Sequence, residues 1–325
     1  MNLSSLLAVP LLDDRFPLPL DRPFTTKQAF GAGLNQRQLR RMLDHGLVRR
    51  MVRGVYVATQ LPDSAELRAA GLGLVVPRDC VVTDWSACWL HTGVDAPNEH
   101  LETPRVSMFR APGRRGLRNG LAASGERRLA PGHVEHVHGI GVTSPLRTAW
   151  DLGRLQHRDV AIGGMDALAR LGAFGVDRLV DGVESFRGER GVVQLRDLAP
   201  RVDPRSESPG ESTLRLRWTD LTSVPHPEPQ VPVPGPGGEE IARLDLAVRE
   251  LRFAMEYDGE RFHSSEEDRA HDTARRRWLF ELHGWVVESV RRENVYGYHR
   301  DVEGLILGGI AEARTTLAAR LRRVG

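Results

Sequence analysis

The segment from residue 241 to residue 259, IARLDLAVRELRFAMEYDG, is the feature that most constrains how this chain can fold. Its two apolar-rich runs, ARLDLAV and RFAMEYDG, are separated only by the polar pair Arg249 and Glu250, a pattern that predicts a β-hairpin. Asp245 lies inside the first run, and Glu256 and Asp258 lie inside the second. Acidic side chains do not suit strands that pack on a core, so their presence needs a further reason.

The spacing of these acids predicts that they meet on one side of the hairpin. Glu256 and Asp258 differ by two positions and therefore project from one face of their strand, and Asp245 can share that face from the neighbouring strand. Converging carboxylates repel unless a cation neutralises them, and oxygen ligands suit Mg²⁺ or Mn²⁺ rather than zinc. The alternative is a network of surface ion pairs, in which Asp245 and Glu256 pair with Arg243, Arg252 or another arginine on a solvated sheet face.

The segments around the hairpin predict a mixed sheet flanked by helices. Ser208 and Glu211 have the spacing of a capping box at the start of a helix. The prolines of PHPEPQVPVPGPGGEE allow at most an edge strand, near residues 230–233. After the hairpin, the run DRAHDTARRRWLFELHGWVVESV predicts a basic helix that ends at Gly284 and a strand that begins with Trp285.

Together these elements resemble the PD-(D/E)XK nucleases over about residues 205–298, and among them the branch related to the very-short-patch-repair endonucleases. The resemblance lies in Glu211 on a helix, Asp245 in RLDLA, and Glu256, the Asp258-Gly259 pair and His263 in AMEYDGERFH. It implies a Mg²⁺-dependent (or Mn²⁺-dependent) hydrolysis of phosphodiesters. In this reading three carboxylates bind the metal, Glu211 assists them, a histidine moves a proton and an arginine faces the phosphate or an acid of the site: Asp245, Glu256, Asp258, Glu211, His263 and Arg275.

The sequence departs from the nuclease pattern at one position. The usual lysine, two residues after the second acid, is Asp258, and Lys27 is the chain's only lysine. In the repair-endonuclease branch other groups replace this lysine, so Asp258 and His263 are reasonable substitutes. The same departure is compatible with an inactive domain, in which His263 caps the next helix.

The N-terminal segment predicts two helices followed by a basic ribbon. Thr25 or Thr26 can cap the first helix and Asn35 the second, and LVRRMVRGVYV alternates like a two-stranded ribbon. This is a winged-helix order, and residues 20–60 resemble the winged helix of the AbiEi family of abortive-infection antitoxins. The predicted DNA contacts are the basic residues of the second helix and the ribbon: Arg37, Arg40, Arg41, Arg49, Arg50 and Arg53. The alternative is a solvated basic face on a protein-docking module.

Length and composition favour several domains in an α+β multidomain chain. Its 325 residues, 40% hydrophobic and 27% charged, are typical of two or three globular domains. The resemblances imply a winged helix over 1–60 and a restriction-endonuclease-like domain over 205–325, with a mixed α/β middle region over 61–200 that has no assigned chemistry. The run APRVDPRSESPG predicts a linker before the last domain. Cys80 and Cys88 match no metal or disulfide spacing and are expected to be buried thiols. The N-terminus has no basic stretch before its apolar run, so we expect a cytoplasmic protein without a membrane span.

Two functions follow from these patterns. The first is a metal-dependent DNA endonuclease whose winged helix holds the DNA that the C-terminal domain cuts. The second is a non-enzymatic, antitoxin-like transcriptional regulator with a degenerate nuclease-like domain. The resemblances imply DNA as a partner, and a toxin or another defence-system protein as a second one.

Overall fold

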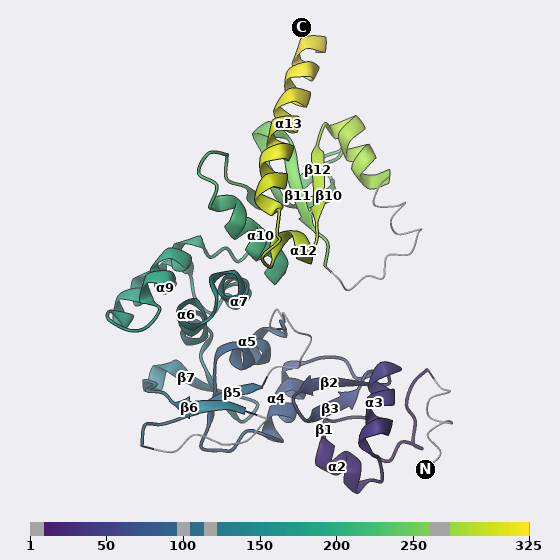
Figure 1. The fold of residues 1–325 in the computed structure, drawn as a ribbon, viewed down its shortest axis with the longest axis vertical. Coiled ribbons are helices and arrows are strands. Elements are labelled where there is room, and N and C mark those ends of the chain that lie inside the picture. The colour runs from purple at the N-terminus through teal and green to yellow at the C-terminus, as the bar shows by residue number, and fades with distance from the viewer. Residues whose placement is uncertain (1–9, 96–104, 114–121, 260–273, 325) are drawn as a thin grey trace.

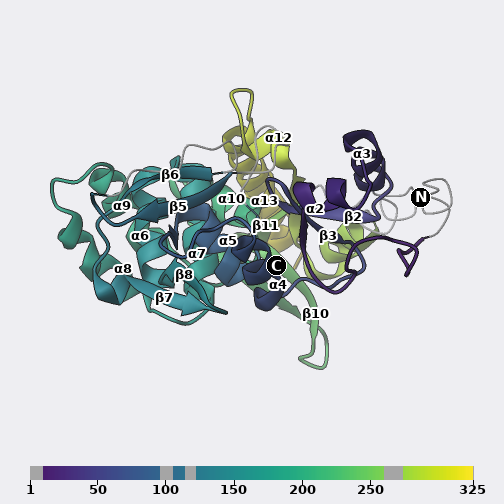
Figure 2. The same cartoon turned by 90° about the horizontal axis from the view of Figure 1, so that it is seen from below.

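The computed structural model describes residues 10–95, 105–113, 122–259 and 274–324, which form an α+β chain with three sheets. Figure 1 shows the C-terminal sheet at the upper end of the long axis and the N-terminal and middle sheets side by side at the lower end. Seen from below, the middle region and the N-terminal helices lie side by side (Figure 2). None of the helices in the described part of the chain is both long and apolar enough to cross a membrane.

The N-terminal elements follow the helix, turn, helix, ribbon order that the sequence predicts. They are β1 (Phe24–Thr25), α2 (Thr26–Gly31), α3 (Gln36–Asp44), β2 (Val48–Val52) and β3 (Val55–Ala58), and the three strands form a sheet in the order β1-β3-β2. Thr25 caps α2 and Asn35 caps α3, each accepting a hydrogen bond from the backbone of the third helical residue. The expected caps are therefore confirmed, because both depend only on neighbouring residues.

The ribbon formed by β2 and β3 has one face on α3, and its other face packs on the middle region. Met51 of β2 shares a core with Leu67 and Leu72 of α4 (Ala65–Gly73). A β-carbon at Gly71 of α4 would lie 3.0 Å from the terminal methyl of Met51, so the two elements are in close contact. The ribbon thus lies between α3 on one side and the middle region on the other.

The middle region contains a five-stranded mixed sheet with strand order β6-β5-β4-β8-β7. Its strands are β4 (Val81–Val82), β5 (Val106–Arg110), β6 (Ala122–Glu126), β7 (Val134–Val137) and β8 (Ile140–Thr143), with η1 (Pro131–His133) before β7. The helices are α5 (Asp84–Thr92), α6 (Pro145–Leu155), α7 (Arg158–Arg170), α8 (Val176–Asp181) and α9 (Val192–Leu198), with η2 (Gly182–Phe186) and η3 (Ala199–Arg201). Leu152, Ile162 and Met165 are fully buried among these helices. Cys80 and Cys88 are free and buried, as the sequence predicts.

The segment predicted to be a linker, residues 199–210, is packed against α7. Val202 and Ser206 are buried, and the side chain of Arg170 on α7 donates a hydrogen bond to the backbone oxygen of Ser206. Its prolines and serines predict a flexible linker. In the structure the same residues form a turn-rich segment, and charged side chains hold its backbone. The middle region and the C-terminal elements are therefore joined by a packed connection.

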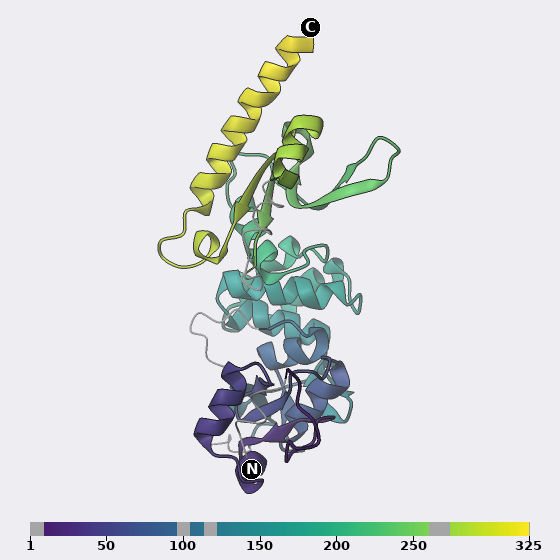
Figure 3. The same cartoon turned by 90° about the vertical axis from the view of Figure 1, so that its right-hand side faces the viewer.

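The C-terminal elements form a four-stranded mixed sheet in the order β12-β11-β10-β9. They are α10 (Pro209–Thr219), β9 (Glu228–Pro234), β10 (Glu240–Val248), η4 (Arg249–Leu251), β11 (Phe253–Tyr257), helical residues 274–278 that continue into η5 (Leu279–His283), β12 (Val286–Val290), α12 (Arg292–Val295) and α13 (Val302–Val324). β10 is antiparallel to β9 and β11, and β12 is parallel to β11. Figure 3 shows α13 running beside this sheet and beyond it.

The sheet is covered on both faces, so its strands have few solvated positions. Trp218 of α10 and Ile306 of α13 pack with Phe253 and Met255, whereas Leu279 and Trp285 pack with Ala247 and Ala254 on the other side. The predicted hairpin and the proline-rich edge strand are both present. Gly284 ends the helix in a left-handed conformation, and the last strand begins at Val286, one residue later than predicted.

Candidate active site

Asp245 and Glu256 occupy opposing positions on the two strands of the hairpin. The register pairs Leu246 with Met255 and Ala247 with Ala254, and its continuation by one residue places Asp245 opposite Glu256. The two acids therefore project from the same face. Asp245 Oδ2 also accepts a hydrogen bond of 2.8 Å from the backbone amide of Tyr257, which ties its carboxylate to β11.

Glu256 is paired with Arg275, which comes from the helix after the hairpin. One guanidinium nitrogen lies 2.9 Å from Oε1 and 3.0 Å from Oε2 of Glu256. A second nitrogen donates to the backbone oxygen of Arg243 at 3.3 Å. Of the two roles expected for Arg275, the structure shows contact with an acid of the site.

Asp258 lies just beyond the end of β11, where its backbone amide donates to the oxygen of Val290 on β12. Its carboxylate is 3.3 Å from Arg291, and its side chain is 45% exposed. Among the described residues, no group of three histidine, cysteine, aspartate or glutamate side chains is arranged to hold a metal ion. Of the three predicted metal ligands, the structure brings Asp245 and Glu256 together, whereas Asp258 pairs with Arg291.

Glu211 lies in the first turn of α10, where Ser208 caps the helix by accepting a hydrogen bond from its backbone amide. The carboxylate does not return to the cap residue as a capping box requires. Instead Oε2 accepts hydrogen bonds from the amide of Glu207 at 2.9 Å and from the side chain of Gln230 at 2.8 Å. The cap explains the helix start, but the buried carboxylate of Glu211 belongs to the acid cluster.

Gln230 of β9 was not identified by sequence reasoning. It has a φ of +55°, in the left-handed region that residues other than glycine rarely adopt, and its side chain binds Glu211. Backbone strain of this kind tends to occur at functional sites. The only signal in the sequence is a single amide residue within a proline-rich edge strand.

The negative charges of Glu211 and Glu256 both act on Asp245. Burial, followed by the negative charge of Glu211, raises the pKa of Asp245 to about 7, and Glu256 acts in the same direction. The amide of Tyr257 and the guanidinium of Arg275 oppose this shift. Asp245 therefore exchanges its proton near neutral pH, which is unusual for an aspartate and typical of groups in functional sites. His263, the predicted proton carrier, lies outside the described residues.

The basic residues predicted to contact DNA differ in their surroundings. Arg37, Arg40 and Arg41 are exposed on α3, where Arg40 also pairs with Asp44 at 3.1 Å. Arg49 is partly buried, donates to the oxygen of Leu61 at 3.4 Å and lies 3.9 Å from Asp63. On the ribbon, Arg50 is exposed, with its guanidinium 5.7 Å from the ring centre of Tyr56, and Arg53 is half-buried.

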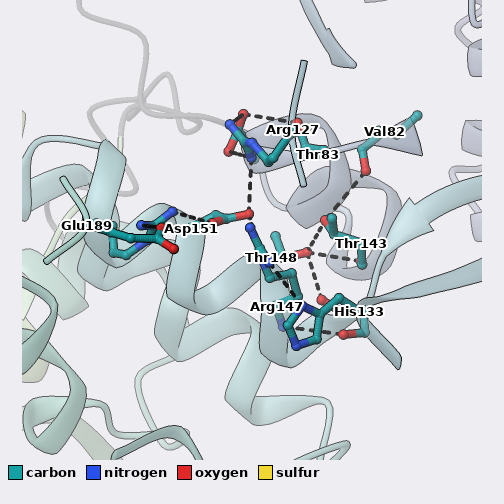
Figure 4. Close-up of polar contacts among 12 residues, drawn as sticks. Val82, Thr83, Arg127, His133, Thr143, Arg147, Thr148, Asp151 and Glu189 are labelled. Atoms are coloured by element: carbon teal, nitrogen blue, oxygen red, sulfur yellow. Dashed lines mark hydrogen bonds and ion pairs between the residues drawn. The ribbon is translucent and has the colours of Figure 1, made fainter. Parts of the chain in front are cut away.

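A second polar cluster lies inside the middle region (Figure 4). Asp151 is fully buried and receives hydrogen bonds from Arg127 at 3.1 Å, Arg147 at 2.8 Å and Arg154 at 3.2 Å. Arg127 also binds Asp84, and Arg154 also binds Glu189, so the buried charges are matched. Each charge has a protein partner, which makes this cluster a structural network.

Comparison with known proteins adds two findings. Residues 21–59 match the family model described as a transcriptional regulator, AbiEi antitoxin. The chain is also 33% identical over 268 residues to the uncharacterized protein MT2308 of Mycobacterium tuberculosis (strain CDC 1551 / Oshkosh), a match that covers 80% of this chain and 93% of that protein. The uncharacterized protein Rv2248 of strain ATCC 25618 / H37Rv matches with the same identity and coverage. The chain therefore belongs to the family of these two mycobacterial proteins and carries an AbiEi-antitoxin-like transcriptional-regulator segment at residues 21–59.

Proposed function

We propose that this protein is a metal-dependent DNA endonuclease. Its N-terminal segment holds duplex DNA, and its C-terminal domain hydrolyses a phosphodiester at Asp245 and Glu256. The observation that carries the proposal is the opposed pair Asp245 and Glu256, with Glu211 close enough to raise the pKa of Asp245.

The surroundings of this pair support the proposal. The pair lies on a hairpin of a mixed sheet, between the helix that carries Glu211 and the helix that carries Arg275. This is the arrangement that the resemblance to PD-(D/E)XK nucleases implies. Placing three carboxylates together at partly buried positions costs folding free energy, a cost that a cation-binding role explains better than a purely structural one.

The donor set fits a hard divalent cation. Asp245 and Glu256 offer only oxygen ligands, and Mg²⁺ commonly binds through one or two carboxylates while it keeps several waters. Such an ion, when bound, would acidify water and offset negative charge on the scissile phosphate. Gln230 holds the carboxylate of Glu211, whose negative charge raises the pKa of Asp245. His263 remains the candidate for proton transfer.

The N-terminal segment supplies a DNA-binding surface in this proposal. Arg37 and Arg41 are one helical turn apart on the exposed face of α3, and Arg50 is exposed on the ribbon behind it. Side chains of this kind bind phosphates and fix the orientation of a duplex. The match to a transcriptional-regulator family over these residues supports the same role.

A non-enzymatic regulator is the second candidate. Two observations favour it: Glu256 is already neutralised by Arg275, and Asp258 stands where the nuclease pattern has lysine. In that case the C-terminal domain would bind DNA, a toxin or another defence-system protein without cleavage.

Supercoiled plasmid distinguishes the two candidates. Purified full-length protein incubated with Mg²⁺, with Mn²⁺ and with a chelator should convert the plasmid to the nicked or linear form only when a metal is present. Retardation of the same plasmid in a gel without any cleavage, under all metal conditions, would support the regulator.

A further inference from the structure

The first turn of α10 is held between the middle region and the C-terminal sheet. A β-carbon at Gly163 of α7 would lie 2.7 Å from Cβ and 2.8 Å from Cα of Pro209, so α7 touches the backbone of this turn. A β-carbon at Gly210 would lie 2.1 Å from the ring of Tyr257 on β11. Glycine at both positions allows α7, α10 and β11 to approach more closely than any larger residue would permit.

From this packing we infer that α7 of the middle region positions Glu211 at the acid cluster, with Gly163 and Asp166 as its positioning residues. The inference rests on the proposed function of that cluster and assigns a role to the middle region. The N-terminal segment also packs on this region through Met51, and α10 packs on it through Leu216, so both the N-terminal and the C-terminal elements contact the middle region.

Asp166 fixes the helix next to Glu211. It is fully buried, accepts from Arg215 of α10 at 2.7 Å and from the backbone amide of Asp203 at 2.9 Å, and also binds the hydroxyl of Ser212. Ser212 directly follows Glu211. One buried carboxylate on α7 therefore holds both the segment before α10 and the first two turns of that helix.

Thr213 provides a further connection. Its hydroxyl lies 2.8 Å from the backbone oxygen of Asp159 on α7 and 2.8 Å from the hydroxyl of Tyr296. The Tyr296 hydroxyl is also 3.2 Å from the backbone oxygen of Pro209. Because Glu211 is part of this turn, a shift of α7 moves its carboxylate relative to Gln230 and Asp245.

Adjacent glycines on α7 provide a matched test. Gly163→Ala and Gly164→Ala add the same methyl group and gain the same helix propensity. The methyl at position 163 meets Pro209 of α10, whereas the methyl at position 164 meets Leu152, at 2.5 Å, and Trp85 within the middle region. Only the first variant disturbs the contact that holds Glu211.

Asp166→Asn is a second variant that keeps the shape of the side chain. Its control is Asp220→Asn, which removes a charge from the opposite end of α10, where Asp220 pairs with Arg158 at 2.7 Å and Arg201 at 2.6 Å. Both substitutions act on the contact between α10 and the middle region, but only Asp166 lies next to Glu211.

Amide hydrogen exchange of the full-length protein, followed by mass spectrometry, reads out the position of α10 without any activity. We expect Gly163→Ala and Asp166→Asn to accelerate exchange about tenfold in residues 207–215 and 228–232, with little change for the two controls. Unchanged exchange in both segments for both variants, or equal acceleration by the controls, would overturn the inference. If Gly163→Ala does not fold, Asp166→Asn decides.

Cleavage adds a separate readout. Where the wild-type protein nicks plasmid, Gly163→Ala should lower kcat and leave the DNA dissociation constant unchanged, because Glu211 acts at the cleavage site. A wild-type protein that never nicks overturns the proposed function, and the exchange data still decide whether α7 positions Glu211.

Discussion

Arg275 donates to both carboxylate oxygens of Glu256, at 2.9 and 3.0 Å. This guanidinium neutralises one of the two acids that we propose as ligands, while the raised pKa of Asp245 lets it hold a proton near neutral pH. The cluster therefore avoids carrying several uncompensated charges. A divalent cation must compete with Arg275 for Glu256.

This competition predicts the effect of Arg275→Gln. Loss of the guanidinium should tighten Mg²⁺ binding, measured by isothermal titration calorimetry, by roughly tenfold, since it removes an ion pair of about 1.4 kcal/mol or more. Arg276→Gln is the control, because Arg276 binds the hydroxyl of Ser289 at 3.0 Å instead of Glu256. Equal or weaker binding by Arg275→Gln would exclude competition at Glu256.

The raised pKa of Asp245 predicts a pH-dependent stability. From its ordinary value of 3.8 to its value of about 7 in the folded chain, the folded state holds a proton that the unfolded state has released. The free energy of unfolding should therefore fall as the pH rises through this window, and level off above it. Asp245→Asn should not show this fall in the free energy of unfolding, because asparagine does not titrate.

The measurement is urea unfolding of wild type and Asp245→Asn at pH values from about 4 to about 8, a range that spans the pKa of Asp245 in the unfolded and in the folded chain. The stability of Asp245→Asn relative to wild type should increase up to about pH 7 by on the order of 2–4 kcal/mol. Glu250→Gln, at an exposed turn, should run parallel to wild type. A constant difference between Asp245→Asn and wild type would show that this carboxyl titrates normally.

Local features of the C-terminal domain could be predicted from the sequence. The hairpin follows from two apolar runs around a polar break, the edge strand from its prolines, and the start of α10 from Ser208. Each depends on residues within a few positions of one another. The opposition of Asp245 and Glu256 follows from the same short turn, since the turn sets the register.

Contacts between distant segments could not be predicted in this way. Gln230 reaches Glu211 from another element, Arg291 reaches Asp258 from the parallel strand β12, and Gly163 meets Pro209 from the middle region. Nothing in the local pattern around these residues specifies the partner. An acid such as Asp166 within the apolar run of α7 is the one signal that could have indicated a buried ion pair.

The different surroundings of the N-terminal arginines predict which of them bind DNA. Arg37→Ala combined with Arg41→Ala should reduce the slope of log affinity against log salt by roughly 1.8, as expected for the loss of two phosphate contacts. Arg49→Ala should change the slope less, because Arg49 already contacts Leu61 and Asp63. Fluorescence anisotropy with a labelled duplex at several salt concentrations measures both. A larger effect from Arg49 would place the DNA on the ribbon instead of α3.

The buried network of the middle region predicts a large loss of stability. Asp151→Asn leaves Arg127, Arg147 and Arg154 without their shared carboxylate, which should cost about 3–5 kcal/mol of unfolding free energy. Glu184→Gln is the control, because its pair with Arg196 is exposed and should contribute under about 1 kcal/mol. Similar denaturation midpoints for the two variants would show that Asp151 is not the centre of the network.

Nicking of supercoiled plasmid by Glu256→Gln, beside wild type and Glu250→Gln, tests the central claim most directly. Glu256→Gln keeps the shape of the side chain but removes the charge that faces Asp245, whereas Glu250 lies at the exposed turn of the same hairpin. In Mg²⁺ or Mn²⁺ we expect wild type and Glu250→Gln to nick the plasmid, and Glu256→Gln to remain folded and lose this activity. Equal metal-dependent nicking by Glu256→Gln and wild type, or no nicking by wild type with either metal, would contradict the endonuclease proposal.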